Sequence, residues 1–410
     1  MTTKPNASQM ALSRILEYAA KGQSMNQEIS AVLPDINGQE VSDLCKLASD
    51  TRGQRSDKIV TFSPKVFIPL TRLCRDICGY CTFRQDPQNL SDLYMSPDAI
   101  IRVAAQGEKL GCTEALFTLG ERPELKYPEA RKWLDSRGFK STLDYLKFAC
   151  QLVLTETTLL PHANPGTMSH REMASLLPFN PSMGLMLEST SEKLYRSGGP
   201  HALAPSKRPT VRLKTLEIAG QLGIPFTTGI LVGIGESRQD RIDSLLELRR
   251  INRTYGNIQE VIIQNFRSKP QTPMQSSPDA SDIEMLWTVA TARILLGPEM
   301  NLQVPPNLSA DNYEIYLDAG INDWGGVSPL TIDYVNPEAP WPQLADLQSR
   351  SASKGFELRP RLPIYPEFFT KSHVKQSELL RAHIDTLIDS DGYVKGGMSR
   401  YVAPDYRRCE

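Results

Sequence analysis

The chain has 410 residues, and its 46 Lys and Arg residues nearly balance its 47 Asp and Glu residues, so the formal net charge is -1. This balance gives no sign of a nucleic-acid partner or an anionic membrane surface, and no apolar run approaches the roughly 18 residues that span a bilayer. The first ten residues, MTTKPNASQM, are not followed by the apolar stretch of a signal peptide. We therefore expect a cytoplasmic protein with no membrane partner.

Residues 1–63 predict a helical extension, because apolar residues recur at helical spacing over 12–20 and 41–51. From residue 64 the pattern changes to short apolar runs that alternate with helical patterns. The predicted strands are 66–70, 114–119, 159–163, 184–188, 226–232, 260–266, 302–306 and 323–328. The predicted helices between them include 96–111, 142–157, 211–223, 237–256 and 281–297. Residues 357–410 are predicted to form a helical tail packed on this unit, with one helix at 377–389.

Eight strand–helix alternations over roughly 275 residues are typical of an α/β fold of the (β/α)8 or TIM-barrel type. We place this barrel at residues 64–356. An open doubly wound sheet is the competing architecture, but no GxGxxG turn follows the first predicted strand. A six-stranded partial barrel also remains open, because the eighth strand has the weakest pattern.

Three of the seven cysteines stand close together, Cys74, Cys78 and Cys81, in C-x3-C-x2-C spacing. Three thiolates on one loop can bind three irons of a 4Fe–4S cluster and leave the fourth iron open to a ligand. Structural zinc is the alternative, but it needs four ligands, and the next cysteine is Cys112. The remaining cysteines, Cys45, Cys112, Cys150 and Cys409, are expected to be inert.

Polar and glycine residues follow almost every predicted strand, where the loops of a barrel carry its chemistry. They are Gly120, Glu121, Asn164, Glu188, Gly233, Gly235, Glu236, Gln264, Asn265, Arg267 and Asn307. Gly and Asn also occur in ordinary turns, so the agreement across several strands counts for more than any one position.

The C-x3-C-x-Y-C pattern after a first barrel strand resembles the radical S-adenosylmethionine (SAM) superfamily. That resemblance implies a 4Fe–4S cluster on the three cysteines, SAM on the open iron, and reductive cleavage to a 5′-deoxyadenosyl radical. It also implies a SAM site. Gly120 and Glu121 partly match the motif that meets the SAM amino group, since Leu119 replaces its first glycine. The other implied SAM contacts are Tyr80, Glu188, Thr190, Arg212, Gly233 and Glu236.

Longer strings narrow the resemblance. FIPLTRLCRDICGYCTF, EALFTLGERPE, LLPHANPG, PFTTGILVGIGES, IQEVIIQNFRSKP and INDWGGVSPLTIDYVNPEAPWP occur in this order. Together they resemble the 7,8-didemethyl-8-hydroxy-5-deazariboflavin synthase family over roughly residues 64–370. The family implies a carbon–nitrogen lyase that closes the ring of the deazaflavin chromophore FO. Its substrate is 5-amino-5-(4-hydroxybenzyl)-6-(D-ribitylimino)-5,6-dihydrouracil, and ammonia, 5′-deoxyadenosine and methionine are released.

The family also implies partners: a tyrosine-adding radical SAM component that supplies the substrate, and an external electron donor. One cysteine loop indicates a single component rather than a fusion of both. We expect a neutral, polyhydroxylated, aromatic substrate to meet amide, guanidinium and indole groups. The candidates are Gln264, Asn265, Arg267, Asn307, Asp323 and Trp324, and the possible proton carriers are His162 and His201.

Three other functions stay open at this point. The chain could be the tyrosine-adding component itself, or a radical SAM enzyme similar to biotin synthase. A non-catalytic barrel that binds a metal is the alternative of another class. Iron and sulfide analysis separates a cluster from zinc, and SAM cleavage under dithionite separates an enzyme from a binding protein.

Overall fold

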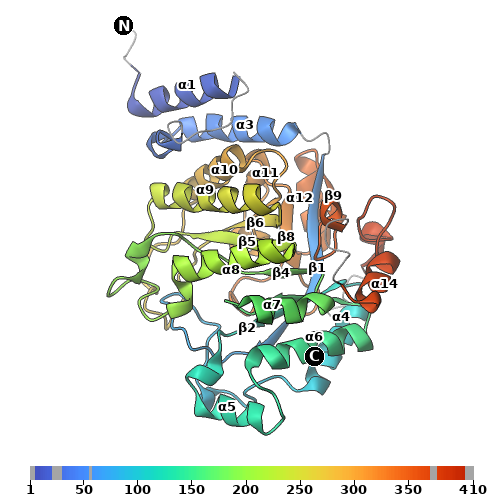
Figure 1. Ribbon diagram of the computed structural model, residues 1–410. Coiled ribbons are helices and arrows are strands. Elements are labelled where there is room, and N and C mark those ends of the chain that lie inside the picture. The colour runs from blue at the N-terminus through green and yellow to red at the C-terminus, as the bar shows by residue number, and fades with distance from the viewer. Residues whose placement is uncertain (1–4, 21–29, 55–57, 370–375, 402–410) are drawn as a thin grey trace.

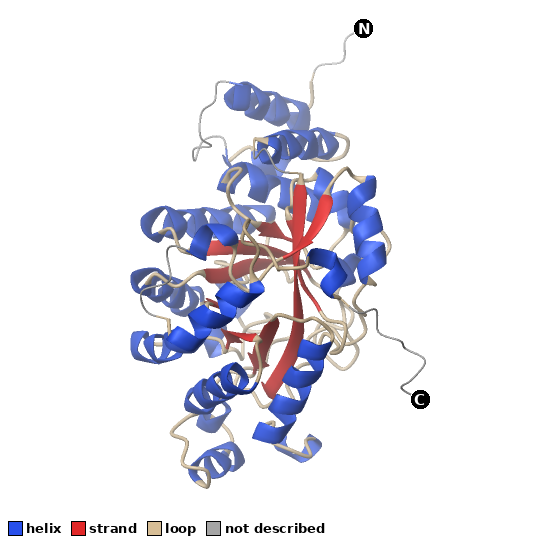
Figure 2. Cartoon of the chain, turned by 90° about the vertical axis from the view of Figure 1, so that its right-hand side faces the viewer, coloured by secondary structure: helices blue, strands red, loops and turns tan. Residues whose placement is uncertain are grey.

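The computed structural model describes residues 5–20, 30–54, 58–369 and 376–401. Parts of the predicted extension and tail, including Cys409, lie outside these residues. Among the described residues, no helix has the length and apolar character needed to cross a membrane. A closed barrel of parallel strands lies at the centre, surrounded by helices (Figures 1 and 2).

Eight parallel strands form the barrel, and β1 closes it by pairing with both β2 and β8. The strands are β1 (Ile59–Thr71), β2 (Glu114–Leu119), β3 (Leu160–Asn164), β4 (Ser182–Gly184), β5 (Phe226–Val232), β6 (Ile258–Asn265), β7 (Leu302–Gln303) and β8 (Asp323–Val327). The prediction of an eight-stranded α/β barrel is confirmed. The doubly wound and six-stranded alternatives are wrong, because the strand order runs from β2 through β8 to β1 and β1 pairs again with β2, which closes a sheet of eight strands.

Helices cover the outside of the barrel. They are α4 (Pro97–Lys109), α5 (Pro128–Asp135), α6 (Thr142–Glu156), α7 (His170–Leu176), α8 (Pro209–Leu222), α9 (Arg238–Tyr255), α10 (Asp282–Leu296), α11 (Ile315–Asp318) and α12 (Leu344–Ser353). Their ends carry local sequence signals. Ser237 and Asp240 form a capping box at the start of α9, and Gly256 ends that helix in the left-handed conformation.

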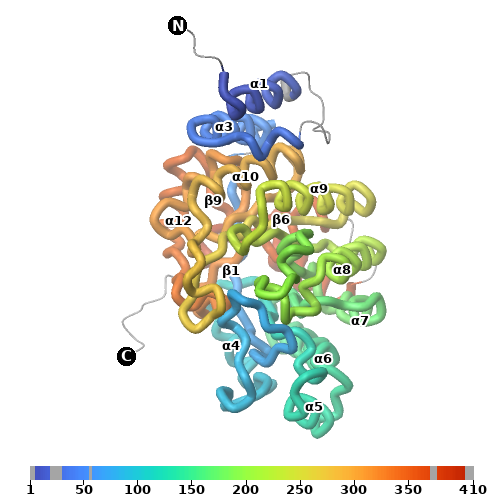
Figure 3. The backbone as a smooth tube through the Cα atoms, turned by 90° about the vertical axis from the view of Figure 1, so that its left-hand side faces the viewer, coloured from blue at the N-terminus to red at the C-terminus, as the bar shows by residue number. Residues whose placement is uncertain are grey.

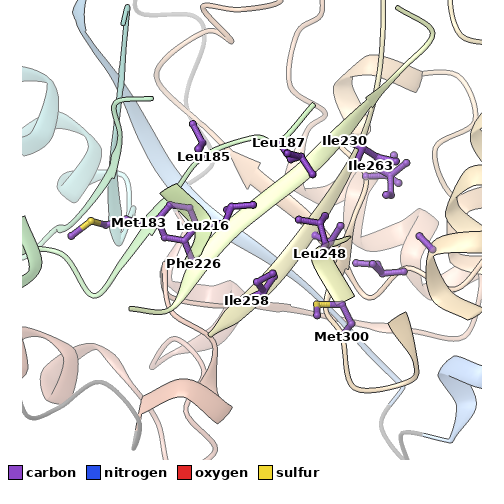
Figure 4. Close-up of a cluster of buried hydrophobic side chains, with 14 of the residues drawn as sticks. Met183, Leu185, Leu187, Leu216, Phe226, Ile230, Leu248, Ile258, Ile263 and Met300 are labelled. Atoms are coloured by element: carbon purple, nitrogen blue, oxygen red, sulfur yellow. The ribbon is translucent and has the colours of Figure 1, made fainter. Parts of the chain in front are cut away.

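The main hydrophobic core lies between the outer face of the strands and these helices. Figure 4 shows part of it, where Phe226 and Ile230 of β5 and Ile263 of β6 lie near Leu216 of α8 and Leu248 of α9. Because side chains alternate along a strand, the neighbouring residues of β5 and β6 point into the barrel. The same alternation that builds the core therefore fills the barrel interior with a second, more polar set of side chains.

The N-terminal helices α1 (Ala7–Ala20) and α3 (Glu40–Gly53) lie at one end of the molecule, next to α10 (Figure 3). Trp287 of α10 donates a hydrogen bond from its indole to the Leu33 carbonyl oxygen at 3.1 Å. β1 begins at Ile59, so the strand extends into the segment that the sequence assigns to the extension.

The C-terminal segment joins the barrel through a ninth strand that the sequence did not predict. β9 (Glu357–Pro360) pairs in parallel with Ile59–Phe62, the first residues of β1. Helix α14 (Glu378–Leu387) follows and packs against α6 and β3 through a small apolar cluster that includes Leu154, Leu380 and Ile384. The segment between β9 and α14 carries Arg361 beneath the barrel, where its backbone N–H bonds the Phe62 carbonyl at 2.8 Å.

Candidate active site in the barrel

The three cysteines of the C-x3-C-x2-C loop line one cavity of about 360 Å³ with the carboxyl ends of the strands. The loop follows β1 and is held from two sides. Ile77 and Gly79 donate backbone hydrogen bonds to the carbonyls of Leu203 (3.0 Å) and Pro200 (2.7 Å). A volume near 360 Å³ is within the range of small-molecule sites.

The thiols of the cysteine loop are protonated in the absence of a metal. Burial raises the pKa of Cys74 to about 12 and also raises the pKa of Cys78. Such thiols stay protonated at neutral pH until a metal displaces the proton. Within the described residues, no three Cys, His, Asp or Glu side chains are grouped to share one metal ion. A 4Fe–4S cluster is held differently, by separate thiolates on separate irons, and three thiols on one loop fit it.

Gly120 allows the end of β2 to touch the cysteine loop. A Cβ atom at this position would lie 1.9 Å from the Leu73 carbonyl oxygen and 2.7 Å from Cys74 Cβ. The backbone N–H of Glu121 then donates to Cys74 Sγ at 3.2 Å. The sequence linked Gly120 to SAM, and the structure shows in addition that the cysteine loop itself requires a glycine here.

Glu121 lines the cavity but also ties two loops together. Its carboxylate accepts hydrogen bonds from the Thr167 backbone N–H (3.0 Å) and hydroxyl (2.6 Å), and burial raises its pKa. Gly166 makes this possible, because a Cβ there would lie 1.8 Å from Glu121 Oε2. Thr167 was missed by the sequence analysis, although it directly follows the NPG turn after β3.

Glu188 lies in the cavity wall in the left-handed conformation, with φ of 67°. It forms an ion pair with Lys207. Burial opposes ionisation of Glu188, but the positive charges of Lys207 and Arg212 outweigh burial and hold its pKa below the usual value. A strained, ionised carboxylate in a cavity is a common mark of a functional site. Lys207 was missed, because its loop has no regular pattern.

Arg212 and Tyr80 also line the cavity. Arg212 donates from Nε to the Ser206 carbonyl at 3.0 Å and from its guanidinium to the Met186 carbonyl, so it braces the Glu188 loop. The Tyr80 hydroxyl lies 2.9 Å from His201 Nε2. Burial lowers the pKa of His201 to about 3, so this histidine is neutral and supports Tyr80 from behind the cavity wall.

Three implied SAM contacts lie outside the set of cavity-lining residues. Thr190 bonds Ser244 of α9 through its backbone N–H (2.9 Å) and its hydroxyl (3.1 Å). Glu236 accepts from the backbone N–H of Gly233 (2.8 Å) and pairs with Arg241 of α9 (2.7 Å). Gly233 and Glu236 therefore shape the turn between β5 and α9, and Thr190 joins the loop after β4 to α9.

The substrate candidates divide in the same way. Gln264, Asn265 and Arg267 line the cavity, with Arg267 half-exposed and paired to Asp279 at 3.3 Å. Asn307 instead bonds Asp333 (3.1 Å) and the Ala339 carbonyl (3.1 Å). It lies outside the lining set and fixes the loop after β7.

Trp324 and Asp323 point to opposite sides of β8, as strand alternation requires. Trp324 is fully buried among the outer helices, where its indole bonds Ser351 at 3.1 Å and its ring packs edge-on against Tyr313. It is a core residue that faces away from the cavity. Asp323 points inward and is held by Arg361 at 2.6 Å, beneath the cavity.

His162 faces the cavity from β3, and its Nδ1 lies 2.8 Å from the Ser182 hydroxyl. That hydroxyl donates its one proton to the Pro363 carbonyl at 2.5 Å, so it must accept from Nδ1–H. Nε2 therefore carries the lone pair. Burial lowers the pKa of His162 to about 4, which keeps the ring neutral at physiological pH.

The barrel interior holds charges that the sequence analysis did not select. Lys65 of β1 pairs with Glu114 of β2 at 2.8 Å, and Arg361 pairs with Glu260 of β6 at 3.0 Å. Burial raises the pKa of Glu260 to about 7, although Arg361 opposes the rise. A usable signal existed, since a charged residue inside an apolar strand pattern, as in SPKVFIPL, is rarely buried without a purpose.

Comparison with known proteins identifies the superfamily. Residues 68–248 match the Radical SAM superfamily model. The fold is similar to the FeFe-hydrogenase maturase HydG from Carboxydothermus hydrogenoformans, with a TM-score of 0.70 and 19% identity over 92% of this chain and 88% of that chain. It is also similar to methylornithine synthase (PylB), with a TM-score of 0.64 and 18% identity over 84% of this chain and 97% of that chain. At these identities the likeness concerns the fold alone.

Closer relatives carry deazaflavin names. FO synthase of Streptomyces avermitilis is 48% identical over 94% of this chain and 46% of its own length, so this chain spans about half of that relative. The 7,8-didemethyl-8-hydroxy-5-deazariboflavin synthase of Methanopyrus kandleri is 48% identical over 82% of this chain and 100% of its own length. The second match covers a complete relative. This chain therefore belongs to the 7,8-didemethyl-8-hydroxy-5-deazariboflavin synthase family of the radical SAM superfamily.

Proposed function

We propose that this chain is the ring-closing component of FO synthesis, a radical SAM carbon–nitrogen lyase. Its substrate would be the hydroxybenzyl adduct 5-amino-5-(4-hydroxybenzyl)-6-(D-ribitylimino)-5,6-dihydrouracil. Its products would be FO, ammonia, 5′-deoxyadenosine and methionine. The observation that carries the proposal is a barrel cavity lined by three free cysteines, in a chain that matches a 7,8-didemethyl-8-hydroxy-5-deazariboflavin synthase over that relative's whole length.

Cys74, Cys78 and Cys81 would hold a 4Fe–4S cluster, and SAM would bind beside it. When bound, these groups supply one-electron cleavage of SAM and a radical that abstracts hydrogen from the substrate. Glu121 and Glu188 are carboxylate side chains of the cavity wall next to the cysteine loop, and they suit the SAM ammonium and ribose. Tyr80 and Arg212 would complete that wall, while Thr190, Gly233 and Glu236 would act only by shaping the loops.

The chain's own residues would bind and orient the adduct. The walls between the cysteines and the barrel interior include Leu119, Leu185 and Ile262, which would exclude water from the reacting ring. Gln264 and Asn265 present amides suited to a uracil edge. Of the two histidines considered as proton carriers, His201 has its Nε2 engaged by Tyr80, whereas His162 keeps a free Nε2 lone pair at the inner end of the cavity.

Two partners follow from this role. A tyrosine-adding radical SAM component would supply the adduct, and an external one-electron donor would reduce the cluster. The length relation supports the first partner, because FO synthase of Streptomyces avermitilis is about twice as long as the matched segment. We place the reaction in the cytoplasm.

The test is anaerobic incubation of the reconstituted protein with SAM, dithionite and the preformed adduct. FO, 5′-deoxyadenosine, methionine and ammonia should form, while tyrosine with 5-amino-6-(D-ribitylamino)uracil should give no FO. Cys78→Ala should lose the cluster and all SAM cleavage, and Cys112→Ala, a buried cysteine outside the site, should keep both. Consumption of tyrosine would identify the chain as the tyrosine-adding component. If the protein cleaves SAM but converts neither the adduct nor tyrosine, its assignment to the radical SAM superfamily would stand and the proposed reaction would be wrong.

A further inference from the structure

The inner end of the cavity is a polar layer far below the cysteine loop. We call this layer the cavity floor and define it by six side chains from six strands: Lys65, Glu114, His162, Thr227, Glu260 and Gln303. β1 runs on for six residues between Lys65 and its end at Thr71, which is about 20 Å of strand at ~3.3 Å per residue. The SAM-side residues sit at the other end, where the strands finish. The floor is therefore a separate part of the same cavity.

The charges of the floor are neutralised within the protein. Lys65 pairs with Glu114 at 2.8 Å. Glu260 accepts hydrogen bonds from Arg361 (3.0 Å), from the Tyr365 hydroxyl (3.1 Å) and from the Thr227 hydroxyl (3.0 Å). Each cation faces a carboxylate, so the floor presents no net positive charge that would select an anionic ligand such as a phosphate.

Several neutral groups of the floor have no protein partner. Gln303 is only 8% exposed, yet its amide makes no side-chain hydrogen bond within the part of the chain that the structure describes. His162 Nε2 carries a free lone pair, as deduced above from the bonds of Ser182. A buried polar group without a partner costs roughly 1–3 kcal/mol, so a ligand is the expected partner.

Glycines on the neighbouring strands make room for these side chains. A Cβ at Gly325 would lie 1.9 Å from Gln303 Nε2, and the φ of Gly325 is +73°. A Cβ at Gly326 would lie 2.4 Å from Lys65 Cε. The GG pair in the DWGGVS segment therefore has a physical role, because it lets an amide and an ammonium turn inward at the floor.

We infer that the cavity floor is the subsite for a neutral polyol chain, which the proposed reaction supplies as the D-ribityl chain of the adduct. This inference rests on the proposed function and adds an orientation to it. The substrate enters ribityl-first, and its ring stays near the cysteine loop. Each sugar hydroxyl both donates and accepts a hydrogen bond. The lone pair of His162 Nε2 can accept from it, the spare N–H groups of Lys65 can donate to it, and the Gln303 amide can do both.

The experiment measures binding of two fluorescent probes to the reconstituted protein: FO, and the same deazaflavin ring with a methyl group in place of the ribityl chain. Wild type should bind FO at least tenfold more tightly than the methyl probe, as expected for a site built around hydroxyl groups. Gln303→Met keeps the length of the side chain and removes its amide, and it should lose most of that preference. Gln303→Glu keeps the shape and adds a negative charge, and it should lose the preference as well.

Gln151→Leu is the matched control, since Gln151 is exposed on the outer helix α6, and it should keep the full preference. Equal affinity of wild type for the two probes would overturn the inference, as would a Gln303→Met variant that weakens both probes equally. FO formation from the adduct is measured in parallel. Ribityl-dependent binding without FO formation would overturn the proposed function alone, and FO formation without ribityl dependence would overturn this inference alone.

Discussion

Replacing Gly120 by Ala tests whether the cysteine loop must touch the end of β2. The added Cβ would lie 1.9 Å from the Leu73 carbonyl oxygen, and real Cβ atoms essentially never approach closer than 3.0 Å. The loop and the strand end must therefore separate by 1.1 Å, the difference between these distances. Both obstructing groups are backbone or Cβ atoms, so no flexible side chain can relieve the clash. Ligand geometry at a metal site tolerates displacements of only about 0.5 Å.

We predict that Gly120→Ala folds but binds iron poorly. Overpacking of this kind costs about 1–3 kcal/mol, which a folded domain survives. Iron and sulfide per chain are measured after anaerobic reconstitution, and thermal unfolding is followed by circular dichroism. Gly53→Ala is the control, because an added Cβ at Gly53 meets nothing within 4 Å. Wild-type iron content in Gly120→Ala would refute the reasoning that this close approach positions Cys74.

Two further predictions concern the charges inside the barrel. Arg361→Met leaves Asp323 and Glu260 buried without their cation and should lower the free energy of unfolding by about 3–5 kcal/mol in urea titrations. Arg359→Met removes ion pairs with Asp389 and Asp391 and a contact with the Tyr393 ring, all near the surface, and should cost about 1 kcal/mol, so equal losses for the two variants would contradict the assignment. His162 has a folded pKa of about 4, below the usual histidine pKa of 6.5, so protonation of the unfolded chain removes stability as pH falls from 6.5 to 4. His162→Gln should abolish up to about 3 kcal/mol of that pH-dependent loss, and parallel stability–pH profiles for variant and wild type would show that His162 is not buried in its neutral form.

The sequence was sufficient for the features that depend on local pattern. Short apolar runs between helical patterns located seven of the eight barrel strands, although β1 begins at Ile59, well before its predicted start at residue 66, because each run must bury one face whatever its neighbours are. β4 is the exception. It covers Ser182–Gly184 rather than 184–188, and beyond it the pairing with β5 continues only as an isolated bridge between Glu188 and Ile230. The cysteine spacing was equally local, since all three thiols lie on one loop.

Only the tertiary structure decided which polar residues face the cavity. Trp324 and Asp323 are neighbours in a motif that looks uniformly functional, yet the pleat of β8 turns one into the core and the other toward Arg361. Glu236 has the spacing of a ligand contact, but Arg241, one turn into α9, lies close enough to neutralise it. Such partners are set by packing between elements, which one-dimensional spacing does not encode.

The cavity floor shows the same limit most clearly. Lys65, Glu114, Glu260 and Arg361 are separated by up to 296 positions in the chain, and no local pattern connects them. Barrel closure places the strand interiors side by side, and the segment after β9 then brings Arg361 beneath them. Buried charges are stable only when each finds its counter-charge. The sequence by itself determined the barrel and its cysteine loop, and strand register and closure determined which charges meet inside it.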